Sequence, residues 1–205
     1  MSADSEEAPK RPVYLVIALM AMWLTGMNAA AEGWFAIEVI QNPLVSAPSS
    51  VGAADLDSVV QFALIAAIAD NARYALPLGI AELILGSMLV LIAAKALFGR
   101  RASPSFALQV IFANLIVIIV GYALRQPVRE RVVQDVMQSG LEERPAQIAP
   151  ADFQALIHTK WWWTFRVHLG LRLAALSLAA LALSRRSARE LLEPDGNEPS
   201  TEEEG

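Results

Sequence analysis

The sequence predicts an all-α, polytopic membrane protein in which four transmembrane helices carry a small extracytoplasmic helical cap. Two observations predict this fold class. The chain of 205 residues is 55% hydrophobic, and the hydrophobic residues are concentrated in four nearly charge-free segments. Each segment has about 20 residues, the length at which an α-helix crosses about 30 Å of hydrocarbon. These spans are expected at residues 13–31, 76–98, 106–124 and 165–184.

The first span is expected to remain as an uncleaved anchor whose helix continues past the bilayer to Gln41. No helix-breaking residue precedes Pro43. Residues 29–31, all alanine, also resemble the cleavage site of a secretory signal peptide, because basic residues and an apolar run precede them. The acidic residues ahead of that run, and its continuation through Trp34, favour the anchor.

Two segments outside the spans carry helical patterns. Asp55 and Asp57 can cap a helix over residues 59–69, which is too short to span, and Pro77 is expected to kink or break its junction with the second span. Residues 126–139 alternate charged and aliphatic side chains at helical spacing and predict a second outside helix, which Gly140 is expected to end. The outside segments, residues 32–75 and 125–164, would then pack into the helical cap.

The remaining helix boundaries also follow from local signals. Ser103 followed by Pro104 is a typical helix start for the third span, a cap residue and then a residue that needs no N–H partner. Asp152 is expected to cap a single helix that runs to Arg186 and would be about 50 Å long at 1.5 Å per residue.

Net charge is −5, but the acidic residues are concentrated in the tails. Residues 1–11 and 187–205 hold 10 of the 21 acidic residues and only 3 of the 16 basic ones. Both tails are polar and contain proline, so they are expected to be disordered and cytoplasmic. The bundle itself is expected to occupy residues 12–186.

Basic residues flank the same ends of the spans, which predicts that both termini are cytoplasmic in an inner or plasma membrane. These flanking residues are Lys10, Arg11, Lys95, Arg100, Arg101, Arg185, Arg186 and Arg189. Aromatic residues at the opposite ends predict a belt at the outer membrane interface, formed by Tyr74, Tyr122, Trp161, Trp162 and Trp163.

Polar residues within the spans are the main candidates for a site, because charge in hydrocarbon is costly. Glu82 shares a helical face with Gly79 and Gly86, so this face is expected to point into the bundle. Arg172 lies at a similar depth, and an ion pair between Glu82 and Arg172 is expected. The candidate cluster consists of Glu82, Arg172, His168, Arg166, Asn114, Asn28 and Glu32.

This cluster has two interpretations. Ion pairs within a small bundle commonly hold helices together, and this structural role is the favoured interpretation. The other is a polar cavity, open to the outer face, for a solute, ion or proton. A role for His168 as a proton relay or haem ligand has less support, because no second axial ligand is evident on a facing helix.

The composition argues against several classes of function. The chain has no cysteine and two histidines, so thiolate metal sites, iron–sulfur clusters and multi-histidine metal sites are not expected. Catalytic and nucleotide-binding motifs are absent, and the basic residues form membrane flanks instead of a nucleic-acid-binding stripe. We therefore expect neither an enzyme nor a cofactor, metal or nucleic-acid partner.

The leading hypothesis is a non-enzymatic accessory or scaffold subunit in the lipid bilayer, which binds another membrane protein or a second copy of itself. The alternative is a small channel or transporter with an outward-facing polar cavity around Glu82 and Arg172.

Overall fold

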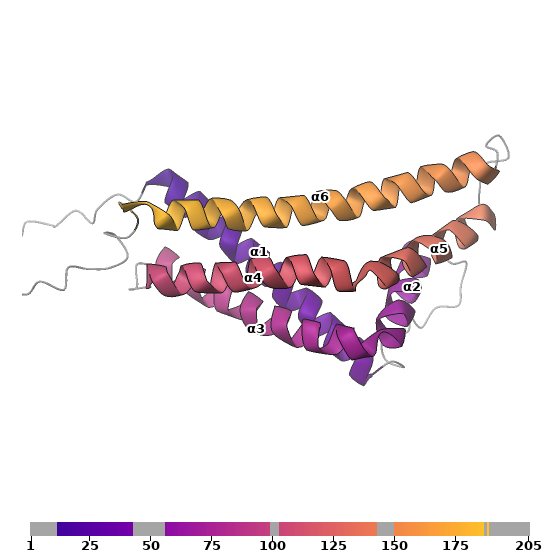
Figure 1. Ribbon diagram of the computed structural model, residues 1–205, viewed down its shortest axis with the longest axis horizontal. Coiled ribbons are helices and arrows are strands. Elements are labelled where there is room, and N and C mark those ends of the chain that lie inside the picture. Colours follow the sequence, from indigo (N-terminus) through magenta and orange to yellow (C-terminus); the bar gives the residue numbers. More distant parts are fainter. Residues whose placement is uncertain (1–11, 43–55, 99–102, 143–149, 187, 189–205) are drawn as a thin grey trace, which may run out of the picture.

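The computed structural model describes residues 12–42, 56–98, 103–142, 150–186 and 188. The predicted tails (residues 1–11 and 187–205, apart from Ala188) and Asp55 lie outside these ranges. The described residues form six helices (Figure 1): α1 (Val13–Gln41), α2 (Leu56–Asp70), α3 (Ala72–Leu97), α4 (Pro104–Leu124), α5 (Gln126–Glu142) and α6 (Pro150–Ser184). Four helical segments are long and apolar enough to cross a membrane: α1, α3, α4 and His158–Ser184 of α6. The all-helical class and the four long apolar helices are therefore confirmed.

Several predicted boundaries are also confirmed. Helix α1 continues to Gln41. Helix α4 begins with Pro104 at its first position, and the Ser103 hydroxyl accepts a hydrogen bond of 3.4 Å from the Phe106 N–H. Helix α6 is one continuous helix of 35 residues, which corresponds to about 52 Å at 1.5 Å per residue.

Three predicted boundaries are wrong. Pro77 does not break the chain, because it lies inside α3 and the break falls at Asn71, between α2 and α3. The alternative, a kink at Pro77, stays a prediction. The Asn71 side chain donates a hydrogen bond of 2.8 Å to the Ala67 carbonyl, which satisfies a free acceptor at the end of α2. Helix α5 continues through Gly140 to Glu142, because glycine lowers helix propensity by only about 1 kcal/mol. Asp152 lies in the first turn of α6, which begins at Pro150.

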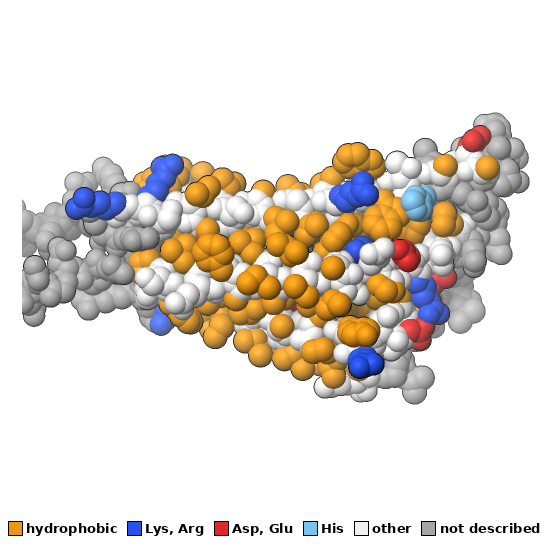
Figure 2. Space-filling view, viewed as in Figure 1, with side chains coloured by type: hydrophobic (Ala, Val, Ile, Leu, Met, Phe, Trp, Pro, Cys, Tyr) orange, Lys and Arg blue, Asp and Glu red, His pale blue; other side chains and the backbone are white. Residues whose placement is uncertain are grey.

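The four long helices run between two distinct ends of the molecule. At one end, here called the basic end, α1 and α4 begin, α3 and α6 finish, and Lys95, Arg185 and Arg186 are found. The other end, here called the capped end, holds α2, α5 and the start of α6 (Figure 1). Figure 2 shows charged side chains near both ends and hydrophobic side chains over the middle. This distribution suits a bundle whose middle lies in hydrocarbon.

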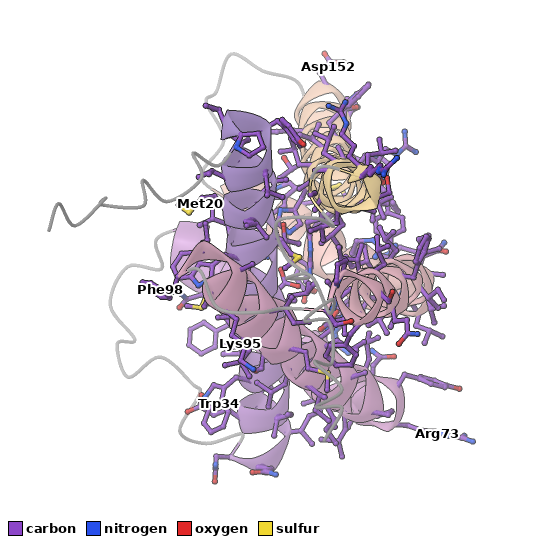
Figure 3. All side chains as sticks on the ribbon, turned by 90° about the vertical axis from the view of Figure 1, so that its left-hand side faces the viewer. Met20, Trp34, Arg73, Lys95, Phe98 and Asp152 are labelled. Carbon is purple, nitrogen blue, oxygen red and sulfur yellow. The ribbon has the colours of Figure 1, made fainter. Side chains whose placement is uncertain are left out.

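Helix α1 crosses the bundle steeply and lies behind the other long helices in Figure 1. Figure 3 views the molecule from the basic end and shows α1 along one side, with Met20 and Trp34 pointing away from the bundle. Near the basic end, α1 packs against α6 through a core that includes Leu19, Met22 and Leu176. Toward the capped end the two helices separate (Figure 1).

Two pairs of glycines allow α1 and α3 to pack closely. A Cβ atom added at Gly26 would lie 2.8 Å from the Gly86 carbonyl oxygen, and one added at Gly33 would overlap the Gly79 carbonyl oxygen. In each helix the two glycines are seven residues apart and so lie on one face. This close approach positions the part of α1 near Glu32 against α3.

Helices α2 and α5 form a second, smaller packing unit at the capped end. Its buried residues are Ala63, Ala67, Val128 and Val132, and Trp161 of α6 packs against them. An ion pair between Arg131 and Asp70 also joins the two helices. Helices α2 and α5 therefore pack against each other, and a cap outside a membrane stays a prediction.

Candidate functional site

Glu82 is the most deeply buried carboxylate in the described part of the bundle, with 2% of its surface exposed. It lies on the face of α3 that also carries Gly79, Gly86 and Ala93, and all four residues are buried. The prediction that this face points into the bundle is confirmed. A carboxylate at such a position requires a compensating partner, because an isolated buried charge is very costly.

Arg125 provides that partner. It follows the last residue of α4, and its Nη2 donates a hydrogen bond of 2.5 Å to Glu82 Oε2. Such charge-assisted hydrogen bonds are roughly twice as strong as neutral ones. The contact ties the capped end of α4 to the middle of α3.

Glu32 of α1 is the second anionic centre. Its Oε2 accepts a hydrogen bond of 2.6 Å from Arg172 Nη1, and its Oε1 accepts one of 2.8 Å from the Asn28 side-chain amide. His168 Nε2 lies 3.5 Å from the same Oε1 atom. Asn28 and Glu32 are one turn apart on α1, and His168 and Arg172 are one turn apart on α6, so the contacts join two helical faces.

The two centres form one network, because Arg125 Nη1 lies 3.8 Å from Glu32 Oε2. Negative and positive side chains alternate along this network, in the order Glu82, Arg125, Glu32, Arg172. They come from α3, the end of α4, α1 and α6, so each long helix contributes one residue. The expected direct pair between Glu82 and Arg172 is wrong. Arg125 lies closer to Glu82, and the steep crossing of α1 brings Glu32 to Arg172 instead.

Two members of the predicted cluster lie apart from this network. Asn114 is buried with 1% exposure, but among the described residues its side-chain amide donates only to the Val110 carbonyl of its own helix, at 3.5 Å. The Arg166 guanidinium lies over the Trp162 ring, 5.9 Å from the ring centre. The cluster that the structure assembles therefore contains Glu82, Arg172, His168, Asn28 and Glu32, with Arg125 added.

Arg125 was not among the predicted site residues, because it was interpreted as one of several basic residues in a long connection. A signal for it was present in the sequence. Asn114, Ile118, Gly121 and Arg125 repeat at helical spacing, and the first three are buried. Arg125 therefore extends the inward face of α4 by one turn.

A cavity of about 290 Å³ adjoins the network. Its polar lining comes from Glu32, Glu82, Arg125, Arg129, His168 and Arg172, and its apolar lining includes Phe35, Leu64, Ile68, Ile118, Val128, Phe165 and Leu169. This volume is close to the lower limit of about 300 Å³ for typical small-molecule sites. The combination of apolar walls and a few convergent polar groups is also typical of such sites.

Arg129 of α5 brings a further positive charge to the cavity. Its guanidinium carbon lies 3.8 Å from the centre of the Tyr122 ring, a cation–π contact, and 6.0 Å from that of Trp162. Burial lowers the pKa of Arg129, yet a guanidinium stays protonated at neutral pH. The cavity therefore contains three permanent positive charges against two carboxylates.

Three buried guanidinium nitrogens at the cavity have no hydrogen-bond partner among the described residues: Arg129 Nε, Arg172 Nε and Arg172 Nη2. Buried polar groups are normally hydrogen-bonded, so each unpaired donor calls for an explanation. In the described part of the chain, no group of three histidine or acidic residues is placed to hold a metal ion. The three nitrogens have almost no accessible surface, so an acceptor in the cavity reaches them only when the arginine side chains turn.

The residues of the predicted aromatic belt have varied surroundings at the capped end. Trp163 and Tyr74 are exposed, Trp162 donates a hydrogen bond of 2.9 Å to His158, and Tyr122 contacts Arg129. Their contact with a membrane interface remains a prediction.

The fold and the site define an all-helical protein with four potential membrane spans and, among them, a mostly apolar cavity with a few charged groups. No protein-family model matches the chain, and no curated protein or solved structure is significantly similar to it. The functional argument therefore depends on the geometry of the cavity.

Proposed function

We propose that this chain is a non-enzymatic integral membrane protein that binds a small ligand in the cavity, as a small transporter or ligand-binding membrane protein does. The protein lies in the inner or plasma membrane with both termini cytoplasmic, so the capped end is extracytoplasmic. The observation that carries the proposal is the position of the cavity, which adjoins the network of Glu82, Arg125, Glu32 and Arg172 and is lined by three arginines against two glutamates.

A purely structural role for the network accounts for less of this arrangement. A network that only holds helices together would be expected to pair its buried donors and to leave no void beside them, because empty space and unpaired donors both destabilise a fold. Arg172 uses one nitrogen for Glu32 and leaves two buried nitrogens unpaired. A ligand that supplies acceptors would satisfy them.

The role of accessory or scaffold subunit remains a separate prediction, because no contact in the described residues bears on a protein partner. Purification from native membrane in mild detergent, with mass spectrometry of co-eluting proteins, tests it. A stoichiometric protein partner would support that role, and isolation as a lone protein would count against it.

The ligand-binding proposal is tested by filling the cavity. Leu169 lines the cavity and is half-buried, whereas Leu171 on the same helix is exposed on its outer face. We expect Leu169→Trp to reduce the amount of small molecule that co-purifies with the protein, measured by native mass spectrometry after release from native membrane. The matched variant Leu171→Trp adds the same side chain outside the cavity and should retain the wild-type amount.

Two outcomes would contradict the proposal. One is a wild-type protein that carries no small molecule of any chemical class and gains no thermal stability from a panel of anionic, cationic and neutral solutes. The other is equal occupancy in the Leu169→Trp and Leu171→Trp variants, provided that both are monodisperse and folded.

A further inference from the structure

The unsatisfied groups at the cavity are all of one kind, since each is an N–H donor on a positively charged guanidinium. Both carboxylates, in contrast, already have partners: Arg125 donates to Glu82, and Asn28 and Arg172 donate to Glu32. The lining also carries three guanidinium groups against two carboxylates, so its charge favours an anion that accepts hydrogen bonds.

The free donors of Arg172 have a particular geometry. Nη1 is engaged by Glu32, whereas Nε and Nη2 are the unpaired atoms. These two nitrogens form one edge of the planar guanidinium, and that edge can bind a carboxylate or phosphate through two parallel hydrogen bonds. Arg172 lines the cavity, so a small rotation of its long side chain presents this edge to a ligand.

The rest of the cavity wall is apolar. Phe35 of α1, Ile118 of α4 and Leu169 of α6 line it together with residues of α2 and α5. A free inorganic anion would leave these walls without contact, whereas a hydrocarbon group would cover them and gain about 25 cal/mol per Å² of apolar surface buried. The lining is thus matched to a ligand with an anionic head and an apolar body.

The exposure of the cavity lining is also informative. Lining residues on α3 and α4, such as Glu82 and Gly121, are buried, whereas Phe35 on α1 and His168 on α6 are exposed. Helices α1 and α6 also separate toward the capped end (Figure 1). The more exposed side of the cavity lining is therefore on α1 and α6.

The seam between α1 and α6 lies within the depth of a bilayer. Arg172 is 12 residues from the end of α6 at Ser184, which is about 18 Å along the helix, and Glu32 is 19 residues from the start of α1 at Val13, which is about 28 Å. Measured along the helices, Arg172 falls in the capped half of a hydrocarbon core about 30 Å thick, and Glu32 falls at its capped edge. A molecule dissolved in that half of the bilayer can reach the seam without crossing the cap.

We propose that the cavity binds an anionic amphiphile, a carboxylate or phosphate head group on a hydrocarbon chain, which enters from the bilayer between α1 and α6. The head group binds at Arg172 and Arg129, and the chain leaves through the seam past Phe35 and Leu169. This inference rests on the proposed function and names the class of its ligand. The cavity of about 290 Å³ holds the head group and the first part of the chain.

The test uses the full chain in phosphatidylcholine nanodiscs and a photoactivatable laurate that carries a diazirine on its hydrocarbon chain. After illumination, the attachment sites are mapped by peptide mass spectrometry. We expect labels on α1 and α6 near Phe35 and Leu169. Unlabelled laurate should compete with the probe, whereas dodecanol, which has the chain alone, and sodium acetate, which has the head group alone, should not.

Two arginines of α6 provide matched variants. Arg172→Gln removes the free guanidinium edge and should weaken capture about tenfold, the effect of losing one or two hydrogen bonds to a charged group. Arg166→Gln removes an exposed arginine that stacks on Trp162 outside the cavity lining and should leave capture unchanged. If Arg172→Gln does not yield folded protein, Leu169→Trp provides the same comparison against Leu171→Trp.

The remaining outcomes separate this inference from the proposed function. If acetate or inorganic phosphate competes with the probe as well as laurate does, the ligand is not an amphiphile. The cavity then binds a free anion from the aqueous phase. Equal competition by dodecanol would overturn recognition of the head group. If no label appears on α1 or α6 while a different class of molecule co-purifies with the protein, the inference fails and the proposed function stands. If no class of molecule binds, both fail.

Discussion

Glu82 on α3 and Arg125 at the end of α4 form a charge-assisted hydrogen bond of 2.5 Å, and the carboxylate of this pair is almost entirely buried. Neither residue has an equivalent substitute nearby, since Glu32, the other carboxylate close to Arg125, is 3.8 Å from it and already binds Arg172. The pair therefore fixes the position of α4 relative to α3.

Removing one partner of this pair should be more harmful than removing both. Arg125→Gln leaves the buried Glu82 carboxylate without its hydrogen-bonded partner and should lower the free energy of unfolding by about 3 kcal/mol. Glu82→Gln should cost less, because Arg125 is partly exposed and keeps Glu32 at 3.8 Å. The double variant should lose less than the sum of the single variants, with a coupling energy of about 2 kcal/mol. Denaturant unfolding in detergent measures all four proteins, and strictly additive effects would contradict the pairing.

The close packing of α1 on α3 should not tolerate a methyl group. A Cβ at Gly33 would lie 2.6 Å from the Leu83 backbone nitrogen, so Gly33→Ala must separate the helices and should cost about 2 kcal/mol. The matched control is Gly170→Ala on α6, where a Cβ meets no atom of the described residues within 4 Å. That variant should be neutral or stabilising by up to about 1 kcal/mol. Thermal unfolding compares the two, and equal costs would contradict the predicted effect.

Asn114 should be dispensable for ligand capture despite its burial. Among the described residues, its amide reaches only the Val110 carbonyl of its own helix, so Asn114→Leu, of similar volume, should change the unfolding free energy by less than about 1.5 kcal/mol. Photolabelling by the laurate probe should equal that of the wild type. If a stable Asn114→Leu protein loses labelling, Asn114 does contribute to ligand binding.

The packing of α2 on α5 should depend on apolar contact more than on the ion pair between them. Val132 is 3% exposed in this contact, so Val132→Ala should cost about 2 kcal/mol of local stability. Arg131 pairs with Asp70, but both side chains are about half exposed, and Arg131→Ala should cost less than about 1 kcal/mol. Hydrogen exchange of the α5 amides reports both changes. A larger effect for Arg131→Ala would show that the ion pair dominates.

The orientation of the chain can be tested directly because it contains no cysteine. We expect a membrane-impermeant maleimide applied to intact cells to label Ala151→Cys, next to the start of α6, and not Ser200→Cys in the C-terminal tail. After the membrane is permeabilised, both variants should react. The reverse pattern in intact cells would place the capped end in the cytoplasm.

The sequence by itself determined the features that depend on local physics. A charge-free segment of about 20 residues must satisfy its backbone hydrogen bonds internally, and this requirement predicted the four long helices. Helical periodicity predicted that Gly79, Glu82 and Gly86 face inward, and the signal of Ser103 with Pro104 predicted where α4 begins.

Only the tertiary structure decided which charges meet. Sequence fixes the height of a residue along its helix, because each residue advances about 1.5 Å, and on this basis Glu82 and Arg172 were expected at similar depth. Whether they touch depends on the crossing angles and rotations of the helices, which arise from packing of the whole bundle. The glycine contacts between α1 and α3 position Glu32 to pair with Arg172, and Glu82 pairs with Arg125. The choice of ion-pair partners and the cavity beside them are therefore properties of the assembled fold.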